Sequence, residues 1–246
     1  MSSQRPIFVG HRGYPAMYPE NTLAGFRAAL EAGALAVECD IQFSRDGVPM
    51  VIHDPSLERT TDDQGKVAER LAADLVSISA HEPLRFGQEK WPEPLPTLAQ
   101  LVELMEQFPN AILFAEIKEE IFDDFARDQC VEKVMDVLRP LGNRFVIISF
   151  DAEVLPLARR AGAAIGWVIK RYNKKSQHTA TALAPEFLIC NYRKLPPMPT
   201  ALWSGHWRWF VYDIVDFPVA KKCVERGVVY IETWDIGAML AVEFGH

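Results

Sequence analysis

The sequence predicts a (β/α)8 TIM barrel of the α/β class. Short apolar runs alternate with amphipathic helical stretches along 246 residues, a length typical of one such barrel. A doubly wound open sheet is the main alternative, and it is disfavoured because no glycine-rich phosphate turn follows the first run. With 49% apolar residues, we expect a single domain over residues 1–246. The expected parallel strands are residues 6–10, 35–42, 111–117, 145–149, 164–168, 186–190, 208–212 and 228–232.

Helical periodicity separates most of these strands. Leu98, Leu101, Val102 and Met105 lie at positions i, i+3, i+4 and i+7, which places them on one face of a helix. Other stretches show the same spacing, or are bounded by capping residues and glycines. These helices are expected at residues 22–32, 131–138, 152–161, 171–185 and 218–226.

Residues 49–54 form a further apolar run, but only five residues separate them from the second strand. A parallel neighbour needs a crossover of about a dozen residues or more, and Asp46-Gly47 is a hairpin signal. We therefore expect an antiparallel flap. Residues 55–97 are polar and turn-rich, with one short helix near residues 71–78, and are expected as an inserted segment that covers a barrel mouth.

Composition excludes several classes of partner. The net charge is −7, and the absence of a basic stripe argues against nucleic acid. No apolar run approaches the roughly 20 residues of a membrane span, so no stable membrane association is expected. The four cysteines are widely spaced and the first strand leaves no room for a signal peptide, so we expect a reducing, cytoplasmic location.

Charged residues gather at the carboxyl ends of the predicted strands. Strand alternation puts Glu38 and Asp40 on one face, and Glu116 and Lys118 repeat the pattern at the next parallel strand. The apolar face should meet the helices, so the carboxylates point into the barrel. Three converging carboxylates form an all-oxygen site that suits one divalent cation, Mg²⁺ or Ca²⁺.

Structural explanations compete with this one. Glu38 and Asp40 could form internal salt bridges with Arg12 and Lys118, and His11 alone is more simply a core histidine. For Asn21, helix capping is favoured over ligand contact. The functional interpretation is favoured because these groups lie at the carboxyl ends of the predicted strands, where barrel enzymes have their active sites. Five ionisable groups are predicted there: His11, Glu38, Asp40, Glu116 and Lys118.

At these residues the chain resembles the bacterial glycerophosphodiester phosphodiesterases. The resemblance implies a TIM barrel and metal-dependent hydrolysis of a small glycerophosphodiester to an alcohol and sn-glycerol 3-phosphate. It is dense up to about residue 150. The matching motifs are His11-Arg12-Gly13, Pro19-Glu20-Asn21-Thr22, Glu38-Cys39-Asp40, Asp46-Gly47, His53-Asp54, Leu95-Pro96-Thr97-Leu98, Glu116-Ile117-Lys118 and Ser149-Phe150.

The resemblance also implies roles for individual residues. It favours His53 as the acid of an acid/base pair and leaves open whether water or a glycerol hydroxyl attacks the phosphorus. The implied cation ligands are Glu38, Asp40 and Glu116, the acid/base pair is His11 and His53, and the phosphate contacts are Arg12 and Lys118.

The C-terminal part departs from the family pattern. Residues 212–215 replace the family's Trp-Thr-Val-Asn, and residues 233–236 replace its Thr-Asp-x-Pro. Two rival functions follow, a lysophospholipase D-like lipid hydrolase and a non-catalytic phosphodiester-binding barrel. Four tryptophans could form a pocket wall or simply pack in the core: Trp203, Trp207, Trp209 and Trp234.

Overall fold

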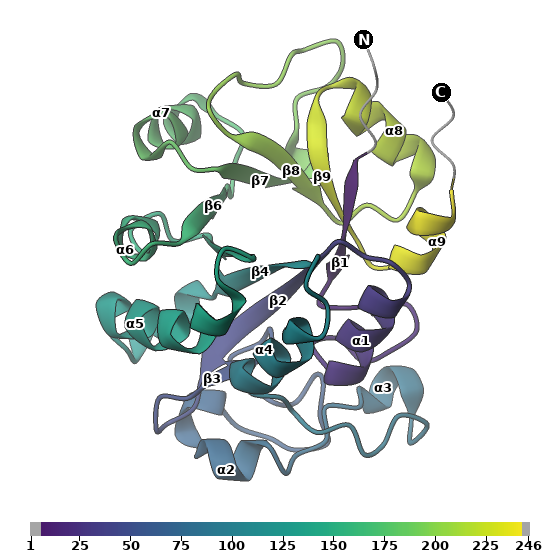
Figure 1. Cartoon of the computed structure of the whole chain (residues 1–246), viewed down its shortest axis with the longest axis vertical. Coiled ribbons are helices and arrows are strands. Elements are labelled where there is room, and N and C mark those ends of the chain that lie inside the picture. The colour runs from purple at the N-terminus through teal and green to yellow at the C-terminus, as the bar shows by residue number, and fades with distance from the viewer. Residues whose placement is uncertain (1–5, 243–246) are drawn as a thin grey trace.

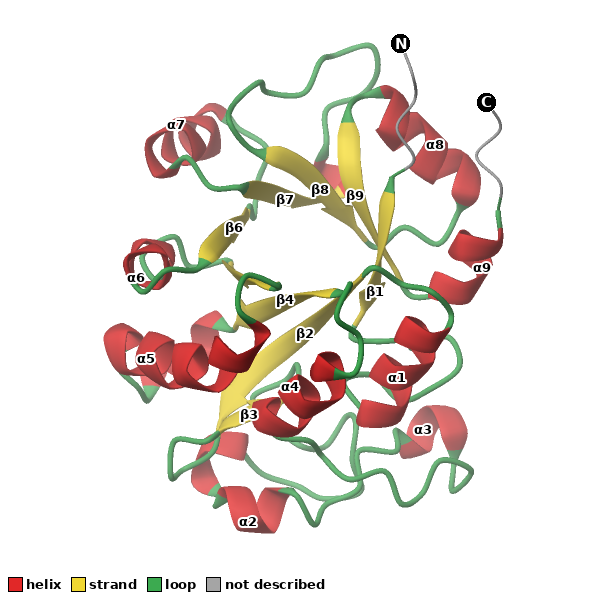
Figure 2. Cartoon of the chain, in the orientation of Figure 1, coloured by secondary structure: helices red, strands yellow, loops and turns green. Residues whose placement is uncertain are grey.

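The computed structural model describes residues 6–242 and confirms the predicted barrel (Figures 1 and 2). Each parallel strand pairs with the next around the ring, and β1 pairs with both β2 and β9, which closes it. The parallel strands are β1 Ile7–His11, β2 Ala36–Phe43, β4 Ile112–Ile117, β5 Phe145–Ser149, β6 Ala164–Val168, β7 Phe187–Asn191, β8 Arg208–Tyr212 and β9 Val228–Thr233.

Helices surround the strands (Figure 2). Thr22 caps the first one by accepting a hydrogen bond from the Gly25 N–H, and Thr97 forms a capping box with Gln100 at another. The surrounding helices are α1 Leu23–Glu31, α4 Leu98–Glu106, α5 Arg127–Leu138, α6 Leu155–Arg160, α7 Lys174–Leu183, α8 Phe217–Glu225 and α9 Ile236–Ala241.

The flap is confirmed as antiparallel. Strand β3, Pro49–Val51, pairs with the end of β2, and the Gln42 side chain donates a hydrogen bond of 3.0 Å to the His53 carbonyl. Beyond it, residues 55–97 contain two short helices, α2 Ala72–Leu75 and α3 Pro83–Phe86, and lie beside the barrel below β3 and α1 in Figure 1. This segment shares a small apolar cluster with the flap, formed by Met50, Ile52, Leu57, Val67, Leu75, Ile78, Ala80 and Leu95.

Aromatic side chains fill the middle of the barrel. Phe114 makes edge-to-face contacts with Phe187, Phe210 and Tyr230 at centroid distances of 5.1, 5.0 and 5.6 Å. Such contacts stabilise beyond the burial of apolar area. The inward side chains of the strands thus form a packed core in the middle of the barrel, as is usual in this fold.

The tryptophans near β8 belong to the core. Trp203 stacks on Tyr172 at 3.8 Å, and both Trp207 and Trp209 are buried in the layer between strands and helices. Trp234 differs, since its ring meets the His11 ring edge-on at 5.8 Å. Core packing is therefore the role of the first three.

The structure bears on the cysteines and on the question of a membrane-spanning helix. All four cysteines are buried free thiols. Within residues 6–242, no helix has both the length and the apolar character needed to cross a membrane.

The aromatic layer should dominate the stability of the barrel. Replacing Phe114, which is fully buried, by alanine removes contacts with three rings and leaves a cavity. We expect Phe114→Ala to lower the free energy of unfolding by about 3–5 kcal/mol in urea denaturation. Leu84→Ala is the control, because Leu84 is 90% exposed and should change stability by less than about 0.5 kcal/mol. If the two variants lost equal free energy of unfolding, the aromatic layer would not be a main source of the stability of the barrel.

Candidate active site at the barrel mouth

A cavity of about 230 Å³ opens at the carboxyl ends of the barrel strands. Six of the seven residues singled out from the sequence line it, and the seventh, Asp40, is buried in its wall. A larger hollow of about 730 Å³ lies outside the barrel between α5 and α6, away from these groups. The described residues that line the smaller cavity are His11, Arg12, Glu38, His53, Glu116, Lys118, Ile148, Phe150, Val168, Ile189, Tyr212, Asp213 and Glu232.

The turn after β1 presents His11 and Arg12 to this cavity. Arg12 and Gly13 have φ values of +54° and +93°, a region that favours glycine. A Cβ on Gly13 would lie 2.8 Å from the Gly25 carbonyl carbon, so only glycine fits there. Such strain in a non-glycine residue persists where the surrounding structure enforces it, and it is common at functional sites.

Asp40 is the most heavily paired carboxylate. Its oxygens lie 3.0 Å from Arg12 Nε and 3.4 Å from Lys118 Nζ, and Asn21 Nδ2 donates to Oδ2 at 2.9 Å. Burial alone would raise the pKa of Asp40, but the two cations outweigh it and hold that pKa well below its usual range. Asp40 therefore forms the internal salt bridges with Arg12 and Lys118 that the sequence offered as a structural explanation.

The expectation for Asn21 needs correction. Thr22 caps helix α1, whereas the Asn21 side chain bonds Asp40 through Nδ2 and accepts a hydrogen bond of 3.3 Å from the Asp40 N–H. Asn21 adopts φ +56°, which turns its side chain toward β2. A left-handed residue just before a cap is not visible in a capping pattern, so the sequence could not reveal this contact.

Glu38 and Glu116 remain less well compensated than Asp40. Lys118 Nζ lies 3.0 Å from Glu116 Oε1, and the backbone N–H of Arg12 donates to Glu38 Oε2 at 3.1 Å. Glu38 Oε1 is buried without a hydrogen-bond partner. Burial and neighbouring carboxylates raise the pKa of Glu38, and burial raises that of Glu116. A bound cation would supply the missing charge.

Three carboxylates fit a hard divalent ion. One oxygen each of Glu38, Asp40 and Glu116 lie within 4.8 Å of one another, and all three residues are buried. The donor set contains only oxygen, which suits hard cations. Glu38 also carries the buried, unpartnered Oε1, and the acidic cluster could bind an ion.

His53 reaches the cavity on the flap and is held by its neighbour. Asp54 Oδ1 lies 2.5 Å from His53 Nδ1, and Arg59 Nε lies 2.5 Å from Asp54 Oδ2. An ionised Asp54 accepts the Nδ1 proton, which leaves Nε2 of the ring as the atom available to a ligand. Hydrogen bonds from His53 and Arg59 lower the pKa of Asp54 well below its usual range despite burial.

Glu20 connects the flap side of the site to the β1 turn. Its carboxylate accepts hydrogen bonds from Arg12 at 2.8 Å and from Arg59 at 2.7 and 2.9 Å, and its backbone N–H donates to Glu82. No residue between 55 and 97 is among the described residues lining the cavity, so the segment acts on the site through such contacts. The motif around Glu20 was visible in the sequence, but its two arginine partners were not.

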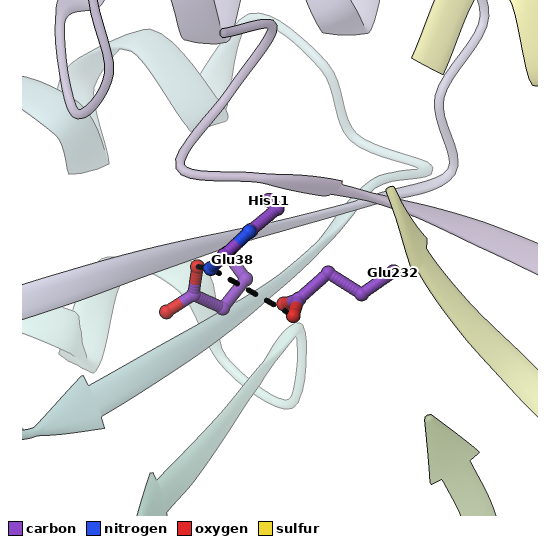
Figure 3. A group of neighbouring side chains, drawn as sticks. All are labelled: His11, Glu38 and Glu232. Carbon is purple, nitrogen blue, oxygen red and sulfur yellow. Dashed lines mark ion pairs between the residues drawn. The ribbon is translucent and has the colours of Figure 1, made fainter. Parts of the chain in front are cut away.

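Glu232 is the functional candidate that the sequence analysis missed. It lies on β9, is 4% exposed, and its Oε2 is 3.9 Å from His11 Nε2, which is also 4.0 Å from Glu38 Oε2 (Figure 3). Burial raises the pKa of Glu232 well above its usual range. The signal was present, because Glu232 ends an apolar run as Glu38 and Glu116 do.

The other half of the cavity is largely apolar. Ile148, Val168 and Ile189 come from the consecutive strands β5, β6 and β7. Phe150 follows β5 directly, and Tyr212 completes this wall from β8. Asp213 stands at its edge with φ +67° and accepts a hydrogen bond of 2.6 Å from Asn191 Nδ2. Residues 212 and 213, where the chain departs from the family pattern, therefore border the site.

Fold and site together define a class, the (β/α)8-barrel enzymes with their polar groups at the strand carboxyl ends. Residues 11–189 match the model of the glycerophosphoryl diester phosphodiesterase family. The chain belongs to this family, and the enzyme class predicted from the sequence, a phosphoric diester hydrolase, is confirmed.

Individual relatives agree over nearly the whole chain. A probable glycerophosphodiester phosphodiesterase 1 from Mycobacterium tuberculosis is 31% identical and covers 93% of this chain and 89% of its own length. Glycerophosphodiester phosphodiesterase 1 from Rattus norvegicus is 38% identical, and the match covers 96% of this chain and 70% of the length of that relative.

Solved structures share the fold. An Oleispira antarctica phosphodiesterase, solved in complex with the product sn-glycerol-3-phosphate, superposes with a TM-score of 0.82 at 23% identity and covers 95% of both chains. The glycerophosphodiester phosphodiesterase from Agrobacterium tumefaciens gives 0.78 at 24% identity, covering 97% of this chain and all of its own. At these identities the likeness establishes the barrel alone.

The Glu20 carboxylate should contribute several kcal/mol to the free energy of unfolding at neutral pH. The side chain is 1% exposed, and replacing Glu20 by glutamine removes the carboxylate that Arg12 and Arg59 share, which leaves Arg12 with Asp40 and Arg59 with Asp54. We expect Glu20→Gln to lower the free energy of unfolding by about 3 kcal/mol in urea denaturation at pH 7. Glu31→Gln is the control, since Glu31 is 61% exposed and forms only a 4.0 Å pair, and it should stay within about 0.5 kcal/mol of wild type.

The same variant has a defined pH dependence. Burial alone would raise the pKa of Glu20, but Arg59 and Arg12 lower it below 4.5. A depressed folded-state pKa stabilises the protein above the unfolded-state value, and this contribution is lost as the pH falls through the folded-state value. The stability difference between wild type and Glu20→Gln should therefore be full above about pH 5 and shrink below pH 4.5. A difference that grows on acidification would refute the assignment.

Proposed function

We propose that this chain hydrolyses small glycerophosphodiesters to an alcohol and sn-glycerol 3-phosphate, with His11 and His53 as its acid/base pair and a divalent cation on Glu38, Asp40 and Glu116. The observation that carries the proposal is the convergence of both histidines, the acidic cluster, Arg12 and Lys118 in one cavity of about 230 Å³. Relatives named for this activity support the substrate class.

The environments of the two histidines support different roles. Burial, followed by the charge of Arg12, lowers the pKa of His11 well below 6.5, so its ring is neutral at physiological pH and can accept a proton as general base. His53 is held by Asp54 through Nδ1, which directs Nε2 to the substrate. When protonated, that atom can donate to the oxygen of the leaving alcohol.

Arg12 and Lys118 are suited to the phosphate group. Both line the cavity, and the guanidinium can make paired contacts to two phosphate oxygens while the ammonium adds a point charge. Asp40 and its neighbours raise the pKa of Lys118 despite burial, so it stays charged. Asp40 therefore also positions the side chains of Arg12 and Lys118.

The acidic cluster completes the charge balance. Mg²⁺ or Ca²⁺ bound there would act as a Lewis acid that stabilises the charge developing on the phosphoryl oxygens. The protein holds the ligands ready, since Asn21 fixes Asp40 and the Arg12 N–H fixes Glu38.

Cavity size favours a soluble substrate over a lipid. Drug-sized ligands occupy sites of roughly 300–1,000 Å³, and this cavity has about 230 Å³. The apolar wall from Ile148 to Tyr212 can receive the alcohol part of a small diester. A coupled assay for released choline, the product common to both substrates, tests this choice by comparing glycerophosphocholine with lysophosphatidylcholine. Faster turnover of the lysolipid would favour the lipid alternative, and no turnover of either would favour a binding protein.

Loss of either histidine should remove most activity without unfolding the protein. We expect His11→Ala and His53→Ala to lower kcat for glycerophosphocholine at least about 100-fold, because general acid/base groups contribute about 10²–10⁴-fold. The matched control is His178→Ala, since His178 is exposed on α7. Circular dichroism should show retained secondary structure. Near-normal turnover in one variant would remove that histidine from the mechanism.

Activity should depend on a divalent cation. EDTA should abolish glycerol 3-phosphate release, and added Mg²⁺ or Ca²⁺ should restore it. Glu116→Gln should raise the cation concentration needed for half-maximal activity at least about tenfold, because a direct ligand is weakened. Glu119→Gln is the control, since Glu119 pairs with exposed Lys170 instead. Full activity of EDTA-treated wild type would contradict the metal proposal.

A further inference from the structure

A second group of metal-ligand atoms lies beside the acidic cluster. His11 Nε2, Glu38 and Glu232 each offer one atom, and these atoms lie within 4.8 Å of one another. Figure 3 shows the imidazole directed between the two carboxylates, with Glu232 reaching it from β9. Glu38 belongs to both groups, so the two sites would share one ligand.

Glu232 gives independent reason to expect a ligand here. Its side chain is 6% exposed, and His11, at 3.9 Å, is its nearest ionic neighbour among residues 6–242. No side chain or backbone N–H in that range donates a hydrogen bond to it. Arg12 and Lys118 contact Glu20, Asp40 and Glu116 instead. A largely buried carboxylate that no arginine or lysine pairs with is destabilising when ionised, and a cation at this point would offset that cost.

His11 is likewise available as a ligand. It is 8% exposed, Nδ1 has no hydrogen-bond partner, and Nε2 is 3.9–4.0 Å from the two carboxylates, too far for hydrogen bonds. Ligand atoms about 2.1 Å from a tetrahedral ion lie about 3.4 Å apart. The two distances from His11 Nε2 would therefore need to shorten by about half an ångström for zinc to bind, and carboxylate rotation can supply a shift of this size.

We propose that His11, Glu38 and Glu232 form a second, inhibitory cation site that takes a transition metal such as Zn²⁺. The ligand types separate the two sites, because imidazole suits Zn²⁺ whereas the all-oxygen cluster suits Mg²⁺ or Ca²⁺. Zinc bound at Nε2 occupies the atom that accepts the proton. Inhibition, though not binding, therefore rests on the function proposed above for His11.

Binding is tested directly on the full chain. With Mg²⁺ saturating, equilibrium dialysis followed by elemental analysis should find one Zn²⁺ per wild-type chain. Glu232→Gln should bind Zn²⁺ at least about tenfold more weakly, because loss of even an outer-shell partner costs about 10–100-fold. Asp213→Asn is the matched control, since Asp213 lines the same cavity outside the cluster and its loss should leave zinc affinity unchanged. Equal zinc affinity in wild type and Glu232→Gln would overturn the proposal.

Inhibition is measured with glycerophosphocholine and saturating Mg²⁺. With inhibition expressed relative to each protein's own zinc-free rate, zinc should inhibit wild type and Asp213→Asn alike, and Glu232→Gln should need at least about tenfold more Zn²⁺ for half-inhibition. Zinc inhibition unchanged in Glu232→Gln would refute the inhibitory role. If wild type shows no turnover at all, the proposed function fails, and the binding experiment still decides the site.

A crystallographic experiment avoids dependence on any variant. Anomalous scattering at the zinc absorption edge from wild-type crystals soaked in Zn²⁺ with excess Mg²⁺ should give a peak between His11 Nε2, Glu38 and Glu232. A peak confined to Glu38, Asp40 and Glu116 would show that zinc merely replaces the first cation and would refute the second site.

Discussion

Balance of buried negative charge at the barrel mouth is the constraint on which the rest of the site depends. Glu38, Asp40, Glu116 and Glu232 come from three strands and are each at most 8% exposed. Isolated charges at such depth cost several kcal/mol each. Arg12 and Lys118 offset Asp40 and Glu116, whereas Glu38 and Glu232 lack a cation among the described residues. The protein thus keeps unbalanced negative charge at the acidic cluster, which could bind an ion.

A chain of ion pairs holds the catalytic candidates from outside the cavity. Arg12 and Arg59 share Glu20, and Arg59 also binds Asp54, which holds His53. His53 stands on a flap and not on a barrel strand, so the barrel alone cannot orient it. Residues 55–97 therefore matter to the site through Arg59, although they do not line the cavity. Networks of this kind set the orientation of side chains that a ligand contacts directly.

Much of the barrel could be predicted because its determinants are local. Period-two alternation located β2 and β4 and oriented Glu38, Asp40 and Glu116, and Asp46-Gly47 located the antiparallel flap. Glu232 was missed although it follows the same strand-end rule as Glu38. Its meaning depends on the pairing of β9 with β1, the first and last strands, and nothing in a local pattern reports that closure.

By itself, the sequence determined the fold class, the family and the identity of the residues at the strand ends, since periodicity and motif spacing are properties of nearby positions. Only the tertiary structure decided which charges meet. Barrel closure places Glu232 beside His11. The left-handed backbone of Asn21 directs its side chain to Asp40, so Asn21 does not cap the helix. Glu20 pairs with two arginines from separate segments. Electrostatic partners are selected by distances of a few ångströms, and such distances between remote segments exist only after the chain has packed.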